Sequence, residues 1–516
     1  MTIRVACVGG GPGGLFFSTL LRRSRPEIEV VLFERNQASD AFGFGVVFSD
    51  RTLQKIDAAD PILHTALERE GVHWDTIDVR LRGESFEFAG NGMAAIHRRI
   101  LLRFLQQNAA DAGVDLRFGV EAPPLAELRT SFDVVVAADG ANSRLRDELA
   151  GELKPEVETA AAKFIWFGTT HRFDGLSFLH QKGPDGNFAA HAYPIGQGLS
   201  TFIVEADEQT WREAGLDGFD MTSPPGTSDE VSQRYLRELF ADDISGAPLV
   251  ANNSRWANFR TRRTARWHAG NVVLLGDAVH TAHFSVGSGT KMAMEDAISL
   301  AEHISASPED LEAAFGAYEE ERQPDVARIQ AAAAPSLSWW EHFAFYYDVL
   351  KPLDFAFHFF SRSIDIDRVR RRDPRLADAV TDAWDREHGA PPLATPLRTA
   401  RGILSARDLT VCGRGGNRTL EDGTGEAWSV GRDVKVLVAP DDSHLVDAPP
   451  AIDEAAVLVE GGSALSRSLI AERLRLERGI PSIILDDDLS DAAAATLILS
   501  GRADAVARTE AVRVGA

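Results

Sequence analysis

The sequence contains few cysteines, no long apolar run and no excess of basic residues. Only two of its 516 residues are cysteines, Cys7 and Cys412, which excludes a disulfide framework and a cysteine-based zinc site. Cys7 lies in an apolar stretch, where we expect a small buried side chain. The chain does not begin with a charged and then apolar signal segment, and no run approaches the length of a membrane span. We therefore expect a cytoplasmic protein with no membrane partner and no metal site.

Acidic residues outnumber basic ones. The 77 aspartates and glutamates exceed the 54 lysines and arginines, for a formal net charge of −23. Because nucleic-acid binding requires a basic face, we expect no nucleic-acid partner. Arginine forks suit phosphate groups, and arginines gather near residues 255–266 and 368–372. We interpret each arginine singly as a solvated charge, and the two clusters as candidate sites for the phosphates of CoA or of a nicotinamide cofactor.

A glycine-rich turn follows the first apolar stretch. Residues 3–8 are expected to form a strand, residues 15–23 a helix and residues 30–33 a second strand. The glycines of the turn have the G-x-G-x-x-G spacing that lets pyrophosphate approach backbone amides, and a carboxylate after the second strand suits ribose hydroxyls. The sequence therefore predicts a dinucleotide site that contains Gly9, Gly11, Pro12, Gly14, Glu34 and Arg35.

A second glycine-rich loop, residues 276–289, lies between a predicted strand at 272–275 and a predicted helix at 290–303. A helix that begins after such a turn offers its backbone amides to an anionic or polar cofactor. Asp277, directly after Gly276, can accept a hydrogen bond from a ribityl hydroxyl, and the turn amides can reach a phosphate or a flavin carbonyl. The loop therefore predicts a second contact with a cofactor.

Two further segments lie between these glycine-rich loops. Residues 133–138 predict a buried strand that delivers Asp139 and Gly140 to a cofactor edge. Arg98 precedes Leu101 and Leu105, whose spacing predicts a helix with one apolar face and a cation at its start. Spacing alone favours a solvated surface charge for Arg98.

The order of these motifs resembles that of the single-component FAD-dependent aromatic hydroxylases, which share the fold of p-hydroxybenzoate hydroxylase. The resemblance extends over about residues 1–375. It implies that the N-terminal turn and Glu34 hold the adenosine half of FAD and that Asp277 holds the ribityl chain. It also implies that Asp139 and Gly140 serve both FAD and the pyridine nucleotide, and that Arg98 contacts FAD.

One departure narrows the resemblance to a smaller branch of that family. Most members have a proline eight residues after the glycine of Gly-Asp, where this chain has Phe284. Residues 42–47, 163–168, 191–193 and 283–291 are similar to the branch of the salicylyl-CoA 5-hydroxylases and the monooxygenase part of 2-aminobenzoyl-CoA monooxygenase/reductase. The resemblance implies cofactor contacts at Gly45, Val46, Val286, Gly287, Gly289 and Thr290, catalytic residues at His283, Phe284 and Ser285, and substrate contacts at His191 and Tyr193.

The reaction implied by the resemblance is hydroxylation of an aromatic acyl-CoA, first of all salicylyl-CoA to gentisyl-CoA. NADH or NADPH would reduce FAD, O2 would add to give a C4a-hydroperoxyflavin, and one oxygen atom would pass to an electron-rich ring. We expect Phe284 to pack near the substrate ring, and His283 or Ser285 to donate or accept a hydrogen bond there. A loop-fixing role for His283 is an equal alternative, and His191 and Tyr193, on one face of a strand, can instead be a core pair.

The expected fold class is α/β. A Rossmann-like FAD-binding domain, residues 1–155 and 266–330, is predicted to contain an inserted mixed-sheet substrate domain at 156–265. A helical segment follows at 331–390, where aromatic residues predict core packing, with a pocket wall or a homodimer contact as alternatives. Residues 391–516 predict a small α/β extension that resembles the last strands of an old-yellow-enzyme-type barrel. This length is too short for a complete barrel of roughly 250 residues, so we expect a truncated one without FMN, with a small thioredoxin-like or flavodoxin-like domain as the alternative.

Two other functions remain open from the sequence. The substrate can be a biosynthetic aromatic without CoA, such as an indole or a carrier-bound acid. The protein can also be an FAD-dependent reductase that inserts no oxygen. A flavin halogenase is disfavoured, because the W-x-W-x-I-P motif of that class is absent from the sequence.

Overall fold

The fold is known from a computed structural model, which describes residues 3–49, 53–224, 226–284, 287, 289–424, 427–441 and 455–510. The chain forms two compact units. The first contains residues 1–81 and 91–344, and the second contains residues 82–90 and 345–516. Both units combine strands with helices, which confirms the predicted α/β class.

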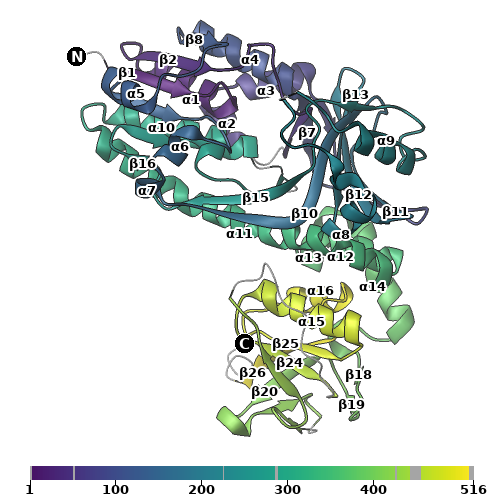
Figure 1. The fold of residues 1–516 in the computed structure, drawn as a ribbon. Helices are drawn as coiled ribbons and strands as arrows, with labels where there is room; N and C mark the ends of the chain where they lie inside the picture. The colour runs from purple at the N-terminus through teal and green to yellow at the C-terminus, as the bar shows by residue number, and fades with distance from the viewer. Residues whose placement is uncertain are drawn as a thin grey trace. The chain divides into compact units, whose positions relative to one another are not determined.

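One sheet of the first unit has six strands and lies at the upper left of Figure 1. Its order is β16 (His268–Ala269), β17 (Val272–Leu274), β9 (Val134–Ala137), β1 (Arg4–Val8), β2 (Glu29–Glu34) and β8 (Asp115–Phe118). All neighbours are parallel except β16 and β17. The central strands are apolar and buried, as is usual for a parallel sheet covered on both faces.

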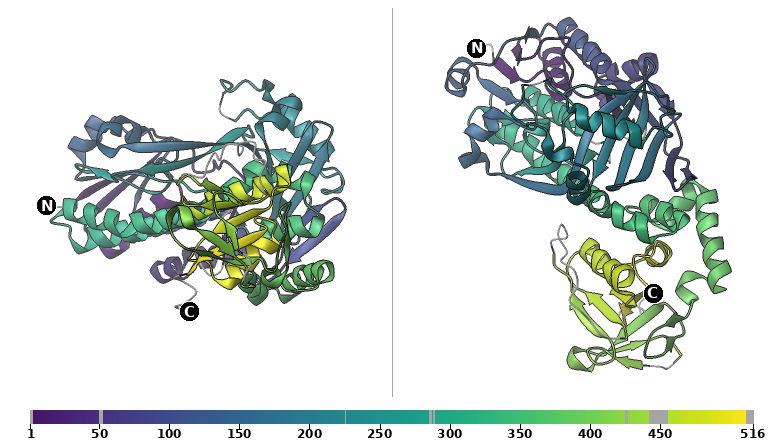
Figure 2. Two further views of the ribbon diagram at one scale, coloured as in Figure 1. Left: turned by 90° about the horizontal axis from the view of Figure 1, so that it is seen from below. Right: turned by 45° about the vertical axis from the view of Figure 1, so that its right-hand side comes forward.

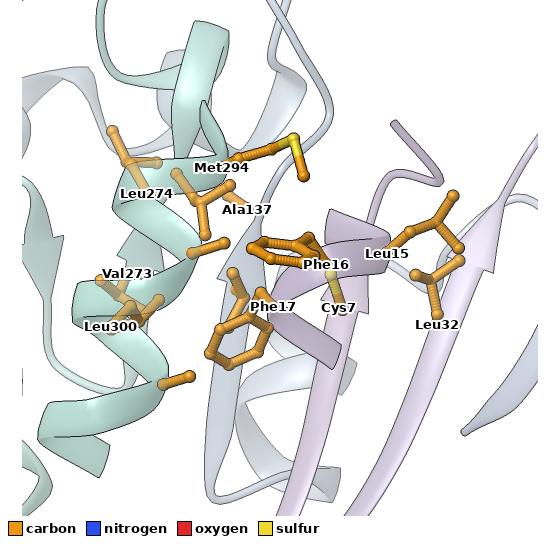
Figure 3. Close-up of a cluster of buried hydrophobic side chains, with 14 of the residues drawn as sticks. Cys7, Leu15, Phe16, Phe17, Leu32, Ala137, Val273, Leu274, Met294 and Leu300 are labelled. Carbon is orange, nitrogen blue, oxygen red and sulfur yellow. The ribbon is translucent and has the colours of Figure 1, made fainter. Parts of the chain in front are cut away.

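Helices α1 (Pro12–Ser24) and α10 (Gly289–Ala306) pack together against this sheet. Figure 3 shows Phe16 and Phe17 of α1 among side chains from α10 and the sheet. The helices approach closely because their facing residues are small. A Cβ atom on Gly13 would lie 2.6 Å from a methyl carbon of Leu275 and 3.1 Å from Cβ of Ala293. This packing fixes the two glycine-rich loops at one edge of the sheet.

The remaining strands of the first unit form two further sheets. One has the order β14 (Leu249–Ala251), β10 (Pro155–Thr169), β13 (Leu199–Ala206), β12 (Gly186–Gly196), β11 (Leu176–Gly183) and β5 (Ile77–Leu81), and β15 (Ala257–Thr264) also pairs with β10. It is mixed, because β5 is parallel to β11. The other has the order β3 (Gly45–Ser49), β7 (Met93–His97) and β4 (Val72–Trp74).

The helices of the first unit lie around these sheets (Figures 1 and 2). One face of the mixed sheet packs on an apolar cluster that includes Leu216, Leu236 and Phe240, from residues 216–240. The other face of the same strands carries aromatic and polar side chains. Further helices are α2 (Gln54–Ala59), α3 (Ile62–Glu70), α4 (Arg98–Asp111), α5 (Leu125–Ser131), α6 (Arg144–Glu148), α7 (Ala150–Leu153), α8 (Glu208–Glu213), η2 (Leu216–Gly218), α9 (Glu230–Leu239), η3 (Gly276–Ala278) and α11 (Leu311–Val349).

The second unit contains a largely parallel sheet. Its order is β22 (Ala427–Ser429), β21 (Thr419–Glu421), β20 (Asp408–Cys412), β26 (Ala505–Thr509), β25 (Ser482–Leu485), β24 (Val457–Glu460) and β23 (Lys435–Val438). Strands β20 and β23–β26 are parallel, and α15 (Ala464–Arg478) and α16 (Asp491–Leu499) connect β24 to β25 and β25 to β26. Both helices lie on one face of the sheet (Figures 1 and 2). The relation to an old-yellow-enzyme-type barrel stays a prediction.

The second unit also contains the helices that follow α11. They are α12 (Pro352–Phe360), α13 (Ile366–Arg372), α14 (Pro374–His388), η5 (Pro392–Ala394) and η6 (Gly415–Asn417), and its short strands are β6 (Glu84–Phe88), β18 (Leu397–Arg398) and β19 (Ile403–Leu404). A buried hydrogen-bonded pair joins α12 to α15. Nε2 of His358 lies 2.8 Å from Oε2 of Glu472, and both side chains are buried.

We predict that this pair makes the second unit less stable in mild acid. Burial lowers the pKa of His358 to about 4, below the ordinary value of 6.5. The unfolded chain therefore binds more protons between these values, and stability should decrease by about 2 kcal/mol from about pH 7 to about pH 5. Hydrogen exchange of peptides from α12 and α15, measured at both pH values, tests this. The variant His358→Gln should lose most of the difference, and an equal pH dependence in the variant would contradict the assignment.

Candidate active site

The first glycine-rich turn brings β1, β9 and α1 into close contact. Gly9 has φ +116°, and a Cβ atom there would overlap the carbonyl oxygen of Ala138. A Cβ atom on Gly14 would overlap the carbonyl oxygen of Gly9. Pro12 is the first residue of α1 and Gly11 is its N-cap. A Cβ atom on Gly11 would meet no described atom within 4 Å, so the helix N-terminus is open to a phosphate group.

Glu34 is fixed beside this turn at the end of β2. Its Oε2 accepts a hydrogen bond of 2.8 Å from the amide of Gly10, and its Oε1 accepts hydrogen bonds from the amide and side chain of Asn36. A carboxylate oxygen can accept more than one hydrogen bond, so Glu34 can still bind a ribose hydroxyl. Arg35, the next predicted residue, is exposed.

Asp139 and Gly140 follow β9 and lie next to the same turn. Oδ2 of Asp139 accepts a hydrogen bond of 2.9 Å from the amide of Arg144. Its Oδ1 is buried and has no hydrogen-bond partner within the described part of the chain. Gly140 has φ +82°, and a Cβ atom on it would meet nothing within 4 Å among the described atoms. An unpaired buried acceptor beside open space fits a hydroxyl group of a bound nucleotide.

Asp277 lies in the second loop, in an environment of mixed charge. Its side chain is exposed, yet desolvation by the surrounding protein raises the pKa of its carboxyl, while His280, Arg98 and Arg262 oppose this rise. Desolvation lowers the pKa of Arg98, and Asp277 opposes that change. The structure therefore brings Arg98 close enough to Asp277 for their charges to interact. Gly276 adopts φ +64°, which directs the chain into this loop.

A buried ion network that the sequence did not reveal lies behind this loop. Oδ2 of Asp296 lies 2.7 Å from Nε2 of His280 and accepts a hydrogen bond of 3.2 Å from the amide of Gly276. Its Oδ1 accepts a hydrogen bond of 2.9 Å from Nε of Arg322, and Nη2 of Arg322 donates to Glu295. The sequence signal for this network was the presence of two acidic residues on the buried side of helix α10. The network fixes the position of the Gly-Asp loop on α10.

Gly45 and Val46 begin β3, next to Arg98. A Cβ atom on Gly45 would lie 2.6 Å from Oγ1 of Thr201, so only glycine fits there. Val46 is buried. The hydroxyl of Tyr193 donates a hydrogen bond of 3.4 Å to the carbonyl oxygen of Gly45, and burial raises the pKa of Tyr193 to about 12. Tyr193 is therefore a neutral donor on the side of the site where Arg98 lies.

Phe284 lies within a group of aromatic rings. Its ring centroid is 5.1 Å from that of Phe164 and 6.0 Å from those of Trp166 and Phe259. His283 is buried and stacks on Phe284 with a centroid distance of 4.4 Å. Phe284 itself is half-buried. Nε1 of Trp166 is buried and, within the described residues, makes no hydrogen bond. An aromatic ligand with a polar acceptor would fit this wall.

The rest of the second loop leads into α10. Ser285 and Val286, both predicted site residues, lie outside the described residues. Gly287 has φ +61°, and a Cβ atom there would contact Val47. Gly289 and Thr290 are the first residues of α10 and are half-buried. The described part of the loop therefore lies between β3 and the aromatic residues of β10.

His191 lies on the aromatic face of the mixed sheet. Its ring centroid is 5.7 Å from that of Phe284, 4.8 Å from Phe178 and 4.1 Å from Trp340. Its Nε2 is 2.7 Å from Oε1 of Glu205, and both side chains are buried. Glu205 was not predicted from the sequence, although a glutamate in the apolar run 199–206 was a usable signal. His191 and Tyr193 thus face different parts of the site.

The chain is similar to known proteins over most of its length. The family described as FAD binding domain matches residues 2–333, more than half of the chain. A salicyloyl-CoA 5-hydroxylase from Streptomyces sp is 52% identical over 98% of this chain and 100% of its own length. The chain belongs to the family of FAD-dependent aromatic hydroxylases. FAD is its cofactor and NADH or NADPH its co-substrate, and bound FAD supplies the chemistry that activates O2.

One further relative and one solved structure match a smaller part of this hydroxylase. A 3-hydroxy-4-methyl-anthranilyl-[aryl-carrier protein] 5-monooxygenase from Streptosporangium sibiricum is 35% identical over 66% of the chain and 89% of its own length. The structure of a mutant 2-methyl-3-hydroxypyridine-5-carboxylic acid oxygenase has a TM-score of 0.53 and 21% identity, and covers 66% of the chain and 93% of its own. The last similarity supports the fold alone.

The structure also bears on the predictions for metal ions, membrane spans, the arginine cluster at 255–266 and the aromatic residues of α11. The described residues contain no group of histidine, cysteine and acidic side chains that could hold a metal ion, and they include no helix with the length and hydropathy of a membrane span. The arginine cluster at 255–266 is divided: Arg262 is buried, while Arg263 pairs with Glu158 at 3.1 Å. The aromatic residues Trp339 and Trp340 are buried, as expected for core packing.

We predict that the ion network is needed for stability of the hydroxylase. Asp296→Asn removes the fully buried carboxylate that pairs with Arg322, and loss of one partner of a buried pair costs about 3–5 kcal/mol. Chemical denaturation of the FAD-free protein measures this cost. Asp325→Asn is the matched control, because Asp325 pairs with the same arginine but is 37% exposed. Its cost should be below about 1 kcal/mol. Equal costs for the two variants would show that the network contributes little.

Proposed function

We propose that the protein hydroxylates salicylyl-CoA at ring position 5 to form gentisyl-CoA, with NADH or NADPH and O2. The observation that carries this proposal is the 52% identity to the Streptomyces sp enzyme, which extends through 98% of the chain and so includes the C-terminal extension. The Streptosporangium sibiricum relative, named for a carrier-bound substrate, matches only 66% of the chain. The aromatic residues around Phe284 suit a benzoyl ring.

We assign the cofactor contacts from the geometry of the two glycine-rich loops. The N-terminus of α1 would hold the pyrophosphate and Glu34 the adenosine ribose, with Arg35 at the exposed edge. Asp277 and Arg98 would hold the ribityl chain and its phosphate. Two further residues would contact both FAD and the pyridine nucleotide, namely Asp139 and Gly140. The remaining contacts proposed for FAD are Gly45, Val46, Gly287, Gly289 and Thr290.

The aromatic residues would orient the substrate and exclude water. The half-buried ring of Phe284 offers a surface on which the benzoyl ring can stack, and the indole N–H of Trp166 can donate a hydrogen bond to the thioester carbonyl. Exclusion of water protects reactive species from hydrolysis. Attack para to the substrate hydroxyl is electronically favoured, and this position is carbon 5 of the salicylyl ring. The substrate thus reacts where the ring is richest in electrons.

The alternative is a carrier-bound or free aromatic acid as substrate. The relative from Streptosporangium sibiricum favours a carrier-bound acid, because that protein is named for an anthranilyl group on an aryl-carrier protein and is 35% identical over 66% of this chain. The two proposals differ in the group attached to the benzoyl carbonyl, and not in the chemistry at the ring.

The proposal is tested by comparing salicylyl-CoA, free salicylate and 2-aminobenzoyl-CoA as substrates of the purified yellow protein. We expect salicylyl-CoA to stimulate NADH or NADPH oxidation and to be recovered as gentisyl-CoA, identified by mass and retention. Free salicylate should have a kcat/KM lower by at least about 100-fold, equal to about 2.7 kcal/mol of lost binding to CoA. Equal rates with free salicylate, or hydroxylation of none of the three, would overturn the proposal.

A further inference from the structure

His191 and Glu205 form a buried pair on the same face as the aromatic wall. They lie on neighbouring strands β12 and β13, where His191 is opposite Ile203, so that Glu205 is its diagonal neighbour on the same side of the sheet. Nε2 of His191 is 2.7 Å from Oε1 of Glu205. The exposed fractions of His191 and Glu205 are only 3% and 2%. A polar pair at this depth requires an energetic reason, since burial of such groups is costly.

The surroundings of the pair are aromatic on one side and ionisable on the other. Phe284, the ring on which we propose that the substrate stacks, is 5.7 Å from the His191 ring. His180 from β11 interacts electrostatically with His191, and Glu341 from α11 with Glu205, while His283 from the second loop stacks on Phe284. Burial and Glu341 raise the pKa of Glu205 well above its ordinary value. The Glu205 carboxyl therefore requires either a proton or a facing cation.

We propose that His191 is the proton acceptor for the ring hydroxyl of the substrate, and that Glu205 is the residue that positions it. This inference rests on the proposed function. The O–H bond of the substrate hydroxyl breaks, its electron pair stays on oxygen, and an N–H bond forms on the imidazole of His191. The imidazolium then faces Glu205 on one side and the phenolate on the other. No oxidant or reductant is needed for this step.

The pair would raise the reactivity of the substrate ring. A phenolate donates more electron density to the para carbon than a phenol does, so proton removal assists attack at carbon 5. General-base assistance of this kind contributes typically about 10² to 10⁴ in rate. Glu205 acts through His191, as the carboxylate of a catalytic triad orients and stabilises its imidazole. The substrate class that fits the pair is therefore a hydroxylated, and not an unsubstituted, benzoyl thioester.

The first test measures proton removal without turnover. Salicylyl-CoA bound to the oxidised FAD-containing protein is titrated with pH, and phenolate formation is followed by absorbance. In His191→Gln, we expect the pKa of the bound hydroxyl to rise by at least about one unit, a tenfold loss of phenolate. His268→Gln is the matched control, because His268 is a buried histidine that faces a glutamate, Glu319, and belongs to the six-stranded sheet. The control should titrate as the unmodified protein does. An unshifted titration in His191→Gln would overturn the proposal.

A second test separates positioning from simple packing. With salicylyl-CoA, His191→Gln should lower kcat by about 100-fold or more and change KM by less than about threefold. Glu205→Gln should show a smaller loss and a displaced pH profile, and Glu205→Asp should recover part of it. Binding of 2-methoxybenzoyl-CoA, which has no proton to lose, should be equal in all variants. If the unmodified protein hydroxylates salicylyl-CoA and the variants keep its pH profile, the pair has no such role. If the unmodified protein does not hydroxylate it, the proposed function fails instead.

Discussion

Replacement of Gly9 by alanine is expected to abolish FAD binding. Gly9 adopts φ +116°, which an L-residue with a side chain rarely adopts, and its added Cβ atom would overlap the backbone of Ala138. The overlapping atom is a carbonyl oxygen in the segment between β9 and Asp139, so no flexible side chain can move to make room. The turn would have to separate β1 from β9 and withdraw the amides that we assign to the pyrophosphate.

The measurement is the FAD content of the purified variant and its Kd for added FAD. We expect the affinity to fall by at least about 100-fold, which corresponds to about 2.7 kcal/mol. Gly316→Ala is a suitable control. Gly316 lies in α11, its added Cβ atom would meet no described atom within 4 Å, and a helical alanine is favoured over glycine. Retention of full FAD affinity in the Gly9 variant would show that the first turn is not the pyrophosphate site.

Truncation of Phe284 to alanine should uncouple NADH or NADPH oxidation from hydroxylation. The half-buried ring packs against Phe164, Trp166 and His283, and we assign it the surface that orients the substrate and excludes water. Without it, reduced protein would still consume O2, but the substrate ring would be poorly held. Product formed per NADH or NADPH oxidised should decrease by about tenfold, the loss expected from about 1.4 kcal/mol of positioning.

Hydrogen peroxide and hydroxylated product are measured together to test this effect. Phe132→Ala provides the control, since Phe132 is a half-buried phenylalanine that packs against Phe33 and Arg4 in the six-stranded sheet. Its coupling should equal that of the unmodified protein. Unchanged coupling in Phe284→Ala would contradict the placement of Phe284 next to the substrate.

Local patterns in the sequence predicted the elements around the cofactor site closely. The strand expected at 133–138 is β9, Val134–Ala137, and the helix expected at 290–303 is α10, Gly289–Ala306. Both predictions were confirmed because apolar runs and glycine spacing depend on neighbouring residues only. The helix expected at Arg98 is also confirmed, since α4 begins there. Its interaction with Asp277 depends on residues far apart in the sequence, which no periodicity could show.

The buried polar groups were the part that sequence patterns could not reveal. Asp296 and Arg322 are 26 residues apart, and His191 and Glu205 come from neighbouring strands. Each of these residues looks like an isolated charge in a one-dimensional pattern. Only the packing of α10 on α11, or of β12 on β13, turns them into pairs. The division of the chain into FAD-binding and substrate domains, and the roles of the predicted site residues, stay predictions.

The central claim is that this protein inserts oxygen into the ring of an aromatic acyl-CoA. It is tested most directly by turnover of salicylyl-CoA under isotopically heavy O2, followed by mass analysis of the thioester product. We predict gentisyl-CoA that carries one heavy oxygen atom, located in the new ring hydroxyl, with one NADH or NADPH consumed per product. Unlabelled salicylyl-CoA recovered unchanged, with heavy hydrogen peroxide as the sole product of O2, would contradict the claim.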